Sequence, residues 1–157
     1  FILRFTGHGT EIFIPIIKTE VTLPSFLYIP FAILVILATT NAINLTDGID
    51  GLSSSVSTII ITCLTIIATM FGTKEIIVFG AIVIGATLGF LMFNLHPAKV
   101  FMGDTGSLSL GATLAAVAIL TEHELSLAVI GGVFVIEALS SIIQLTAIKK
   151  FGKNYTI

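Results

Sequence analysis

No charged residue interrupts the run Val21-Thr-Leu-Pro-Ser-Phe-Leu-Tyr-Ile-Pro-Phe-Ala-Ile-Leu-Val-Ile-Leu-Ala-Thr-Thr-Asn-Ala-Ile-Asn-Leu-Thr46, which is 26 residues long. A helix needs about 20 predominantly apolar residues to cross the hydrocarbon core of a bilayer, which is about 30 Å thick. The run lacks the alternation of polar and apolar residues that marks a membrane-spanning strand, and it is far longer than such a strand. We therefore expect a transmembrane helix here.

Four further apolar runs each predict another spanning helix: Gly51–Thr73, Ile76–Ala98, Thr105–Thr121, and Leu125–Ile148, which only Glu137 interrupts. The third of these has 17 residues. At about 1.5 Å per residue it reaches only about 25 Å, so it needs a thinned bilayer or neighbouring protein. Gly80 and the Gly-x-x-x-Gly pair Gly85 and Gly89 would let a neighbouring helix approach closely. The expected fold class is all-α, a polytopic membrane helix bundle of about five transmembrane helices.

The composition supports a membrane protein. Hydrophobic residues make up 55% of the chain and charged residues only 10%, and the mean hydropathy is +1.12. A soluble domain has about 25% charged residues, so a soluble protein this apolar would lack the polar surface to stay in solution. No basic tract suggests nucleic acid as a partner. Cys63 is the single cysteine, which rules out a disulfide framework. Because the chain begins without methionine and ends just after a basic cluster, we interpret residues 1–157 as part of one larger domain.

Alternating the five spans places the segments 43–51 and 94–106 on one side of the membrane and the turns at 72–75 and 122–124 on the other. Residues 1–22 then lie with the turns, and Pro15 and the β-branched content favour a short hairpin or surface segment there. Lysines are more frequent on the side of the two long loops, where four lie against at most three basic residues opposite: Lys99, Lys149, Lys150 and Lys153 against Lys74, Arg4 and Lys18. The positive-inside rule makes the loop side cytoplasmic and residues 1–22 extracytoplasmic.

All three aspartates of the chain lie in these two loops. Asp47 and Asp50 lie in the first and Asp104 in the second. Carboxylates beside lipid are costly, so three of them at neighbouring helix ends predict a site for a cation or a proton. Asn44 adds an amide oxygen, and an oxygen-rich pocket of this kind suits Mg²⁺ or the hydroxyls of a sugar. The simpler alternative is that Asp50 caps the next helix and Asp47 stabilises a turn.

The second loop combines charge with an aromatic ring. Lys99 could attract a phosphate and Phe101 could stack on a base, beside a helix N-terminus that favours anions. Each residue also has a plainer explanation. Asp104 could be a helix cap, Phe101 a membrane-interface anchor and Lys99 a positive-inside residue, and we expect His96 to be a loop residue rather than a metal ligand.

The motifs that carry this chemistry resemble the signature loops of the phospho-N-acetylmuramoyl-pentapeptide transferase family. The first motif is Asn41-Ala-Ile-Asn-Leu-Thr-Asp-Gly-Ile-Asp-Gly-Leu52, and the second is Phe93-Asn-Leu-His-Pro-Ala-Lys-Val-Phe-Met-Gly-Asp-Thr-Gly-Ser-Leu108. The stretch from Gly131 to Ser140, followed by Gln144, is also similar to that family. The likeness begins at about Glu11 and continues to the end of the chain.

The resemblance implies an Mg²⁺-dependent reaction at the cytoplasmic face of a bacterial inner membrane. Phospho-MurNAc-pentapeptide would pass from UDP-MurNAc-pentapeptide to undecaprenyl phosphate in the lipid bilayer, which gives lipid I and UMP for peptidoglycan synthesis. Such chemistry fits the residues, because joining two anions requires a divalent cation and positive groups that offset their charge. The oligomeric state is open, with a homodimer as one candidate assembly.

The resemblance also assigns roles to residues. Asp47, Asp50 and Asp104 would be catalytic, and Asp104 and Asn44 would be the metal ligands. Substrate would be bound by the pocket residues, with Phe101 stacking on uracil and Asn94 supporting the loop: Asn41, Gly48, Ile49, Asp50, Asn94, Lys99 and Phe101. The identity of the general base is not decided by the sequence.

Two elements of the family pattern, an upstream Asp-Asp pair with a nearby lysine and a downstream His-His-His loop, do not occur in this sequence. We therefore expect part of an active centre and no activity from these residues alone. The related transferases that move GlcNAc-1-phosphate from UDP-GlcNAc to a polyprenyl phosphate share the Asp-Gly-x-Asp-Gly and Met-Gly-Asp elements and remain an alternative. Functions of other classes are an ion-coupled transporter and, from Asp104-Thr-Gly-Ser107, an aspartic protease.

Overall fold

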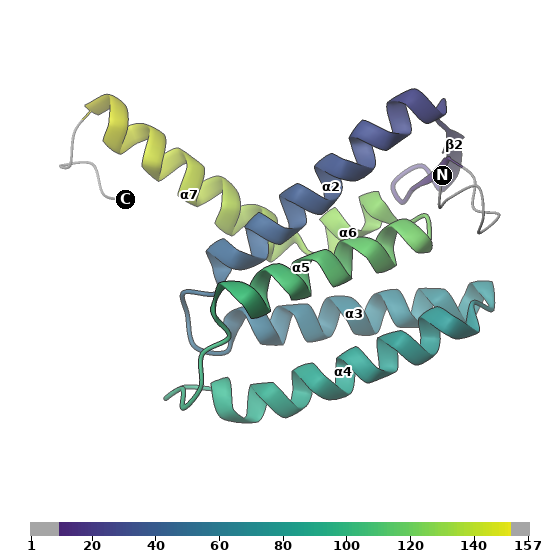
Figure 1. Ribbon diagram of the computed structural model, residues 1–157. Helices are drawn as coiled ribbons and strands as arrows, with labels where there is room; N and C mark the ends of the chain where they lie inside the picture. Colours follow the sequence, from purple (N-terminus) through teal and green to yellow (C-terminus); the bar gives the residue numbers. More distant parts are fainter. Residues whose placement is uncertain (1–9, 152–157) are drawn as a thin grey trace.

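The computed structural model describes residues 10–151, and these form six helices and a two-stranded hairpin (Figure 1). In chain order the elements are β1 (Glu11–Ile14), β2 (Thr19–Thr22), α2 (Ser25–Thr46), α3 (Leu52–Phe71), α4 (Lys74–Asn94), α5 (Gly103–Leu120), α6 (Glu124–Ile130) and α7 (Gly132–Phe151). The all-α membrane fold class is confirmed, because five of these helices are long and apolar enough to cross a membrane.

The fifth predicted span was wrong in its start and in its continuity. We expected one helix from Leu125 to Ile148, but α6 ends at Ile130 and the spanning helix α7 begins at Gly132. The interruption falls at Gly131-Gly132, where glycine lowers the cost of leaving helical geometry. A Cβ at Gly131 would also lie 2.8 Å from the Leu127 carbonyl oxygen and 3.3 Å from Ile60 Cδ1, so α6 ends in close contact with α3.

Helices α2, α5, α3 and α4 pack in this order across the bundle, while α7 diverges from α2 after an initial contact (Figure 1). The closest pairs are α2 with α5 and α3 with α4. Their shared core consists of fully buried aliphatic side chains: Ile43, Ile60, Ile61, Leu64, Leu114 and Val117. This packing holds the ends of α2 and α5 together, which is where Asp47 and Asp104 lie.

Two glycines allow the helices to approach each other. A Cβ at Gly111 on α5 would lie 2.6 Å from Thr40 Cα on α2, and one at Gly80 on α4 would lie 2.1 Å from Thr65 Oγ1 on α3. The prediction for Gly80 is therefore confirmed. For Gly85 and Gly89 it was wrong, since no heavy atom of the described chain lies within 4 Å of a Cβ built there. Both lie on the exposed side of α4, whereas Gly80 is on the side that contacts α3.

The predicted hairpin is present at residues 11–22, where β1 and β2 pair antiparallel with Glu11 opposite Thr22. The Phe13 amide donates a 3.1 Å hydrogen bond to the Glu122 carbonyl oxygen, and the Phe13 ring stacks on His123 at 4.9 Å. Phe71 contacts the same histidine edge-on at 5.4 Å. The hairpin and both short turns thus meet at one end of the bundle, and the aspartate loops lie at the other (Figure 1). Residues 1–9 are outside the described range.

Candidate active site

A hydrogen bond between the two aspartate loops forms the centre of the site. Asn44, in the last turn of α2, donates from Nδ2 to Asp104 Oδ1 over 3.0 Å. Asp104 lies in the first turn of α5, which begins at Gly103. The N-cap of this helix is Met102, which makes no side-chain cap bond, and the Asp104 carboxylate accepts from Asn44. The carboxylate is therefore turned toward α2, and the simple capping explanation does not describe it.

The same amide group of Asn44 makes a second bond. Its Nδ2 also donates to Ser107 Oγ over 2.9 Å. Ser107 is fully buried, with 0% of its surface exposed, and it lies one helical turn after Asp104. Because both amide hydrogens are used in this way, the Asn44 carbonyl oxygen is left for another partner.

Asp47 lies directly after α2 and is half-buried. Burial raises the pKa of its carboxyl group above the ordinary value, a hydrogen bond from the Gly103 amide opposes that rise, and the charge of Asp104 raises the pKa further. Asp47 therefore lies close to the start of α5. Asn44, Asp47 and Asp104 together bring two carboxylates and one amide oxygen to the adjoining ends of two helices.

Asp50 is directed to a different part of the second loop. Its Oδ2 accepts hydrogen bonds from the Ala98 amide at 3.1 Å and pairs with His96 Nδ1 at 3.0 Å. These contacts, the amide first and the histidine second, lower the pKa of Asp50. Residues 47–51 lie between α2 and α3, so Asp47 and Asp50 do not share one helix face. Asp50 does not cap α3 either, because that helix begins after Gly51 without a side-chain cap bond.

Asn94 lies beneath the loops, with only 3% of its surface exposed. Its Oδ1 accepts from the Gly51 amide at 3.1 Å and from Ser54 Oγ at 2.6 Å, and its Nδ2 donates to the Val100 carbonyl oxygen at 3.0 Å. Gly51 has a φ of +72°, and a Cβ there would lie 3.2 Å from Leu95 Cδ2. Asn94 thus joins the first loop to the second, and Gly51 lets them approach.

The remaining predicted substrate-binding residues lie on the surface of the loops. Phe101 is 71% exposed and Ile49 is 61% exposed. Gly48 and Lys99 are also exposed, and the Lys99 amide donates to the Phe93 carbonyl oxygen at 2.8 Å. Asn41 is exposed one turn before Asn44, where its Nδ2 donates to the Leu37 carbonyl oxygen of its own helix at 2.7 Å.

The predicted metal ligands, Asp104 and Asn44, both offer oxygen atoms, and they lie at the adjoining ends of α2 and α5. No cluster of three or more histidine, cysteine, aspartate or glutamate side chains suited to a metal occurs in residues 10–151. The set of Asp47, Asp104 and the Asn44 amide oxygen nevertheless fits Mg²⁺, which prefers oxygen ligands and binds through one or two carboxylates together with water and phosphate. Two carboxylates this close repel each other, and a divalent cation would offset that repulsion.

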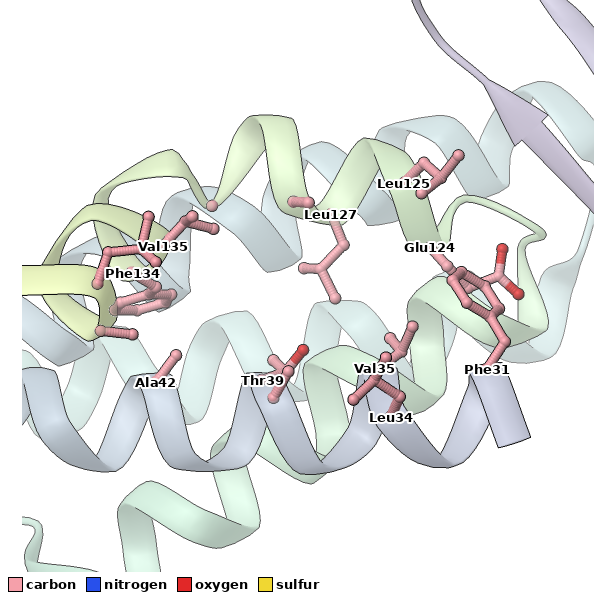
Figure 2. A pocket seen from close by; sticks show the side chains of 15 residues that line it. Phe31, Leu34, Val35, Thr39, Ala42, Glu124, Leu125, Leu127, Phe134 and Val135 are labelled. Atoms are coloured by element: carbon pink, nitrogen blue, oxygen red, sulfur yellow. The ribbon is translucent and has the colours of Figure 1, made fainter. Parts of the chain in front are cut away.

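An apolar groove lies between α2 and the α6–α7 pair (Figure 2). Its volume is about 330 Å³. Ala42, two residues before Asn44, lies at one end near Phe134, and Glu124 lies at the other end near Phe31 (Figure 2). The lining is almost entirely aliphatic and aromatic, so the groove suits a hydrocarbon chain.

Several residues of this arrangement were not found from the sequence. Ser107 belongs to the segment Asp104-Thr-Gly-Ser107. Its position three residues after Asp104, which places both on one helix face, is a signal that could have identified it. Ser54 stands in the serine run after the first loop, and nothing in its spacing marks it. His96 was expected to be a loop residue, and its 84% exposed side chain pairs with Asp50.

Three curated proteins similar to this chain carry the same name. The chain is 49% identical over 152 residues to the phospho-N-acetylmuramoyl-pentapeptide-transferase of Halalkalibacterium halodurans, covering 97% of this chain and 46% of that protein. It is 50% identical over 146 residues to the protein of the same name from Caldanaerobacter subterraneus, covering 93% of this chain and 46% of that protein. For the Clostridium botulinum protein the identity is 47% over 150 residues, with 96% and 46% covered.

The chain therefore spans about half the length of these curated relatives. The sequence pattern of the family described as glycosyl transferase family 4 matches residues 1–122, which is more than half of the 157 residues. On this match the chain belongs to glycosyl transferase family 4.

Proposed function

We propose that these residues form part of the active site of a phospho-N-acetylmuramoyl-pentapeptide transferase. It would transfer phospho-MurNAc-pentapeptide from UDP-MurNAc-pentapeptide to undecaprenyl phosphate, with lipid I and UMP as products. The observation that carries the proposal is the 3.0 Å hydrogen bond from Asn44 to Asp104, which unites the two motif loops at one end of a membrane helix bundle. The names of the relatives at 47–50% identity agree with it.

The location of the site suits the two proposed substrates. A lipid phosphate stays in the membrane and a nucleotide sugar stays in water, so the two can react only at a membrane face. The aspartate loops follow the ends of apolar spans, at the end where Lys99, Lys149 and Lys150 also lie. By the positive-inside rule this end faces the cytoplasm of a bacterial cell.

In this proposal the adjoining ends of α2 and α5 hold Mg²⁺. Asp104 and the Asn44 carbonyl oxygen would be its ligands, with Asp47 beside them. When bound, the cation supplies positive charge against the phosphate oxygens, which lowers the barrier to joining two anions. Ser107 and the Gly103 amide hold the side chains of Asn44 and Asp47 in place.

The exposed loop residues would bind the nucleotide. Phe101 offers an aromatic face at 71% exposure, which suits stacking on uracil. Gly48 and Ile49 give an exposed backbone beside it, and Lys99 offers a positive charge for the diphosphate. Asp50, fixed by the Ala98 amide, would complete the pocket from the first loop.

The apolar groove between α2 and α7 would receive the polyprenyl chain of the acceptor. It starts at Ala42, half a helical turn from Asn44, and continues along α2 as far as Phe31. A chain in this groove would keep its hydrocarbon among apolar side chains, with its phosphate at the end of the groove nearer Ala42.

The proposal is tested by exchange of labelled UMP into UDP-MurNAc-pentapeptide, catalysed by the full-length protein that carries this sequence. We expect exchange that requires both undecaprenyl phosphate and Mg²⁺. UDP-GlcNAc in place of the pentapeptide donor should give none. Exchange with UDP-GlcNAc alone would instead support the related GlcNAc-1-phosphate transferases, and dependence on an ion gradient without any exchange would support a transporter.

A further inference from the structure

We propose that Ser107 is a positioning residue that fixes the orientation of the Asn44 amide, so that Asn44 presents its carbonyl oxygen rather than its nitrogen to a divalent cation. This inference rests on the proposed function of the site. Ser107 itself would touch neither the cation nor the substrates. It would act only through Asn44.

The orientation of the Asn44 side chain follows from its partners. An ionised carboxylate can only accept hydrogen bonds, so the Asn44 group that lies 3.0 Å from Asp104 Oδ1 must be the amide nitrogen. The second amide hydrogen is directed to Ser107 Oγ at 2.9 Å. With both amide hydrogens held by acceptors, the carbonyl oxygen is the group of the Asn44 side chain that remains to be offered to a cation.

The direction of the Ser107 hydroxyl makes it an acceptor for Asn44. A hydroxyl has one hydrogen and two lone pairs, and the hydrogen of Ser107 is directed to the Asp104 carbonyl oxygen at 3.4 Å. A lone pair therefore remains for the Asn44 amide. Ser107 is fully buried, so water cannot replace it as the acceptor.

Asp104 alone would not hold this orientation once a cation binds. The cation attracts the same carboxylate that accepts from Asn44, which weakens that hydrogen bond. Ser107 then remains the acceptor that holds the amide nitrogen, so that the carbonyl oxygen is still the atom of Asn44 offered to the cation. Outer partners of metal ligands commonly change metal affinity by roughly 10-fold to 100-fold when they are removed.

The test measures Mn²⁺ binding to the purified full-length protein in detergent by electron paramagnetic resonance, with Mn²⁺ as the probe for the site. We expect Ser107→Ala to weaken Mn²⁺ binding roughly tenfold. Ser109→Ala is the matched control, because Ser109 is on the same helix and is exposed, and its hydroxyl bonds only the Thr105 carbonyl oxygen at 2.6 Å. We expect that control to bind Mn²⁺ like the unmodified protein.

A double-mutant cycle separates positioning from a general structural effect. In an Asn44→Ala background, Ser107→Ala should cause no additional loss of Mn²⁺ affinity, because the side chain through which it acts is gone. An equal loss in both backgrounds would overturn the proposal, and so would unchanged Mn²⁺ affinity in Ser107→Ala. Should Ser107→Ala fail to fold, Ser107→Cys keeps nearly the same volume with a weaker hydrogen-bonding group and should show the same shift.

Failure of the proposed function gives a different result. If the full-length protein bound Mn²⁺ in a Ser107-dependent manner but exchanged no UMP with either nucleotide sugar, the positioning role would stand and the transferase proposal would fall. If UMP exchange occurred and Ser107→Ala bound Mn²⁺ with unchanged affinity, the positioning role alone would be wrong.

Discussion

The Tyr28 hydroxyl donates a hydrogen bond of 2.6 Å to Glu124 Oε1, across 96 positions of the sequence. Both side chains are buried, and the bond joins the start of α2 to the start of α6 at the end of the bundle away from the aspartates. Glu124 Oε2 has no hydrogen-bond partner among the described residues. The carboxyl group therefore depends on Tyr28 for its side-chain hydrogen bond.

Replacing Tyr28 with phenylalanine should destabilise the protein by about 1–3 kcal/mol, because it leaves the buried carboxyl group of Glu124 without that partner. The free energy of unfolding of the full-length protein in detergent measures this. Phe26→Leu, at an exposed position of the same helix, is the control and should change stability little. Equal stability of Tyr28→Phe and the unmodified protein would show that the hydrogen bond contributes nothing.

Glu124 should make stability depend on pH. Burial is the main cause that raises the pKa of its carboxyl group above the usual 4.5, and the charge of Glu122 adds to the rise. Since the folded state holds the proton more tightly than the unfolded state, the contribution of Glu124 to stability is fully present below the usual pKa. It is lost as pH rises toward the raised pKa. As pH rises from acidic to neutral, the melting temperature of Glu124→Gln should fall less steeply than that of the unmodified protein. Equal slopes of melting temperature against pH in the two proteins would contradict this.

The substitution Gly111→Ala should separate α2 from α5. Its Cβ would lie 2.6 Å from Thr40 Cα, a backbone atom that cannot move aside cheaply. We expect a loss of stability of about 1–3 kcal/mol and a slower UMP exchange, because the same two helices position Asn44 and Asp104. Gly89→Ala is the control, with no heavy atom within 4 Å, and it should be neutral or slightly stabilising. Similar effects of both changes would rule out the close contact.

Asn94→Ala should loosen both loops at once. It removes the acceptor for the Gly51 amide and Ser54 Oγ and the donor to Val100, which should lower stability by about 1–3 kcal/mol. We expect weaker UMP binding in equilibrium titrations and faster proteolysis between residues 94 and 104. Thr69→Ala, whose exposed hydroxyl bonds only its own helix, should leave both measurements unchanged. Unaltered UMP affinity in Asn94→Ala would mean that the hydrogen bonds of Asn94 do not shape the nucleotide pocket.

Four of the membrane spans could be predicted because each is an uncharged or nearly uncharged run close to the length that crosses a bilayer, and the fifth because only Glu137 interrupts its apolar run. The break at Gly131 was missed because no polar residue marks it within the apolar run Leu125–Ile148. For Gly85 and Gly89 the motif alone was misleading, since only the packing of α4 on α3 decides which glycines face a neighbour.

The candidate site could be predicted as a meeting of two loops, because alternating spans bring Asp47 and Asp104 to the same end. The finer contacts could not be predicted. The separation of Asp47 from Asp50 depends on which backbone amides the second loop presents, namely Gly103 and Ala98. Neither amide is visible in a pattern of side chains. Likewise, the bond from Asn44 to Ser107 required the relative rotation of α2 and α5.

The most direct measurement of the central claim is the rate of UMP exchange by the full-length protein carrying Asp104→Asn, with UDP-MurNAc-pentapeptide, undecaprenyl phosphate and Mg²⁺ present. The substitution keeps the size of the side chain and removes the charge that would bind the cation. We expect exchange to be abolished while the protein still inserts into the membrane. A near-normal exchange rate in properly inserted protein would contradict the assignment of Asp104 and the Asn44–Asp104 centre of the site.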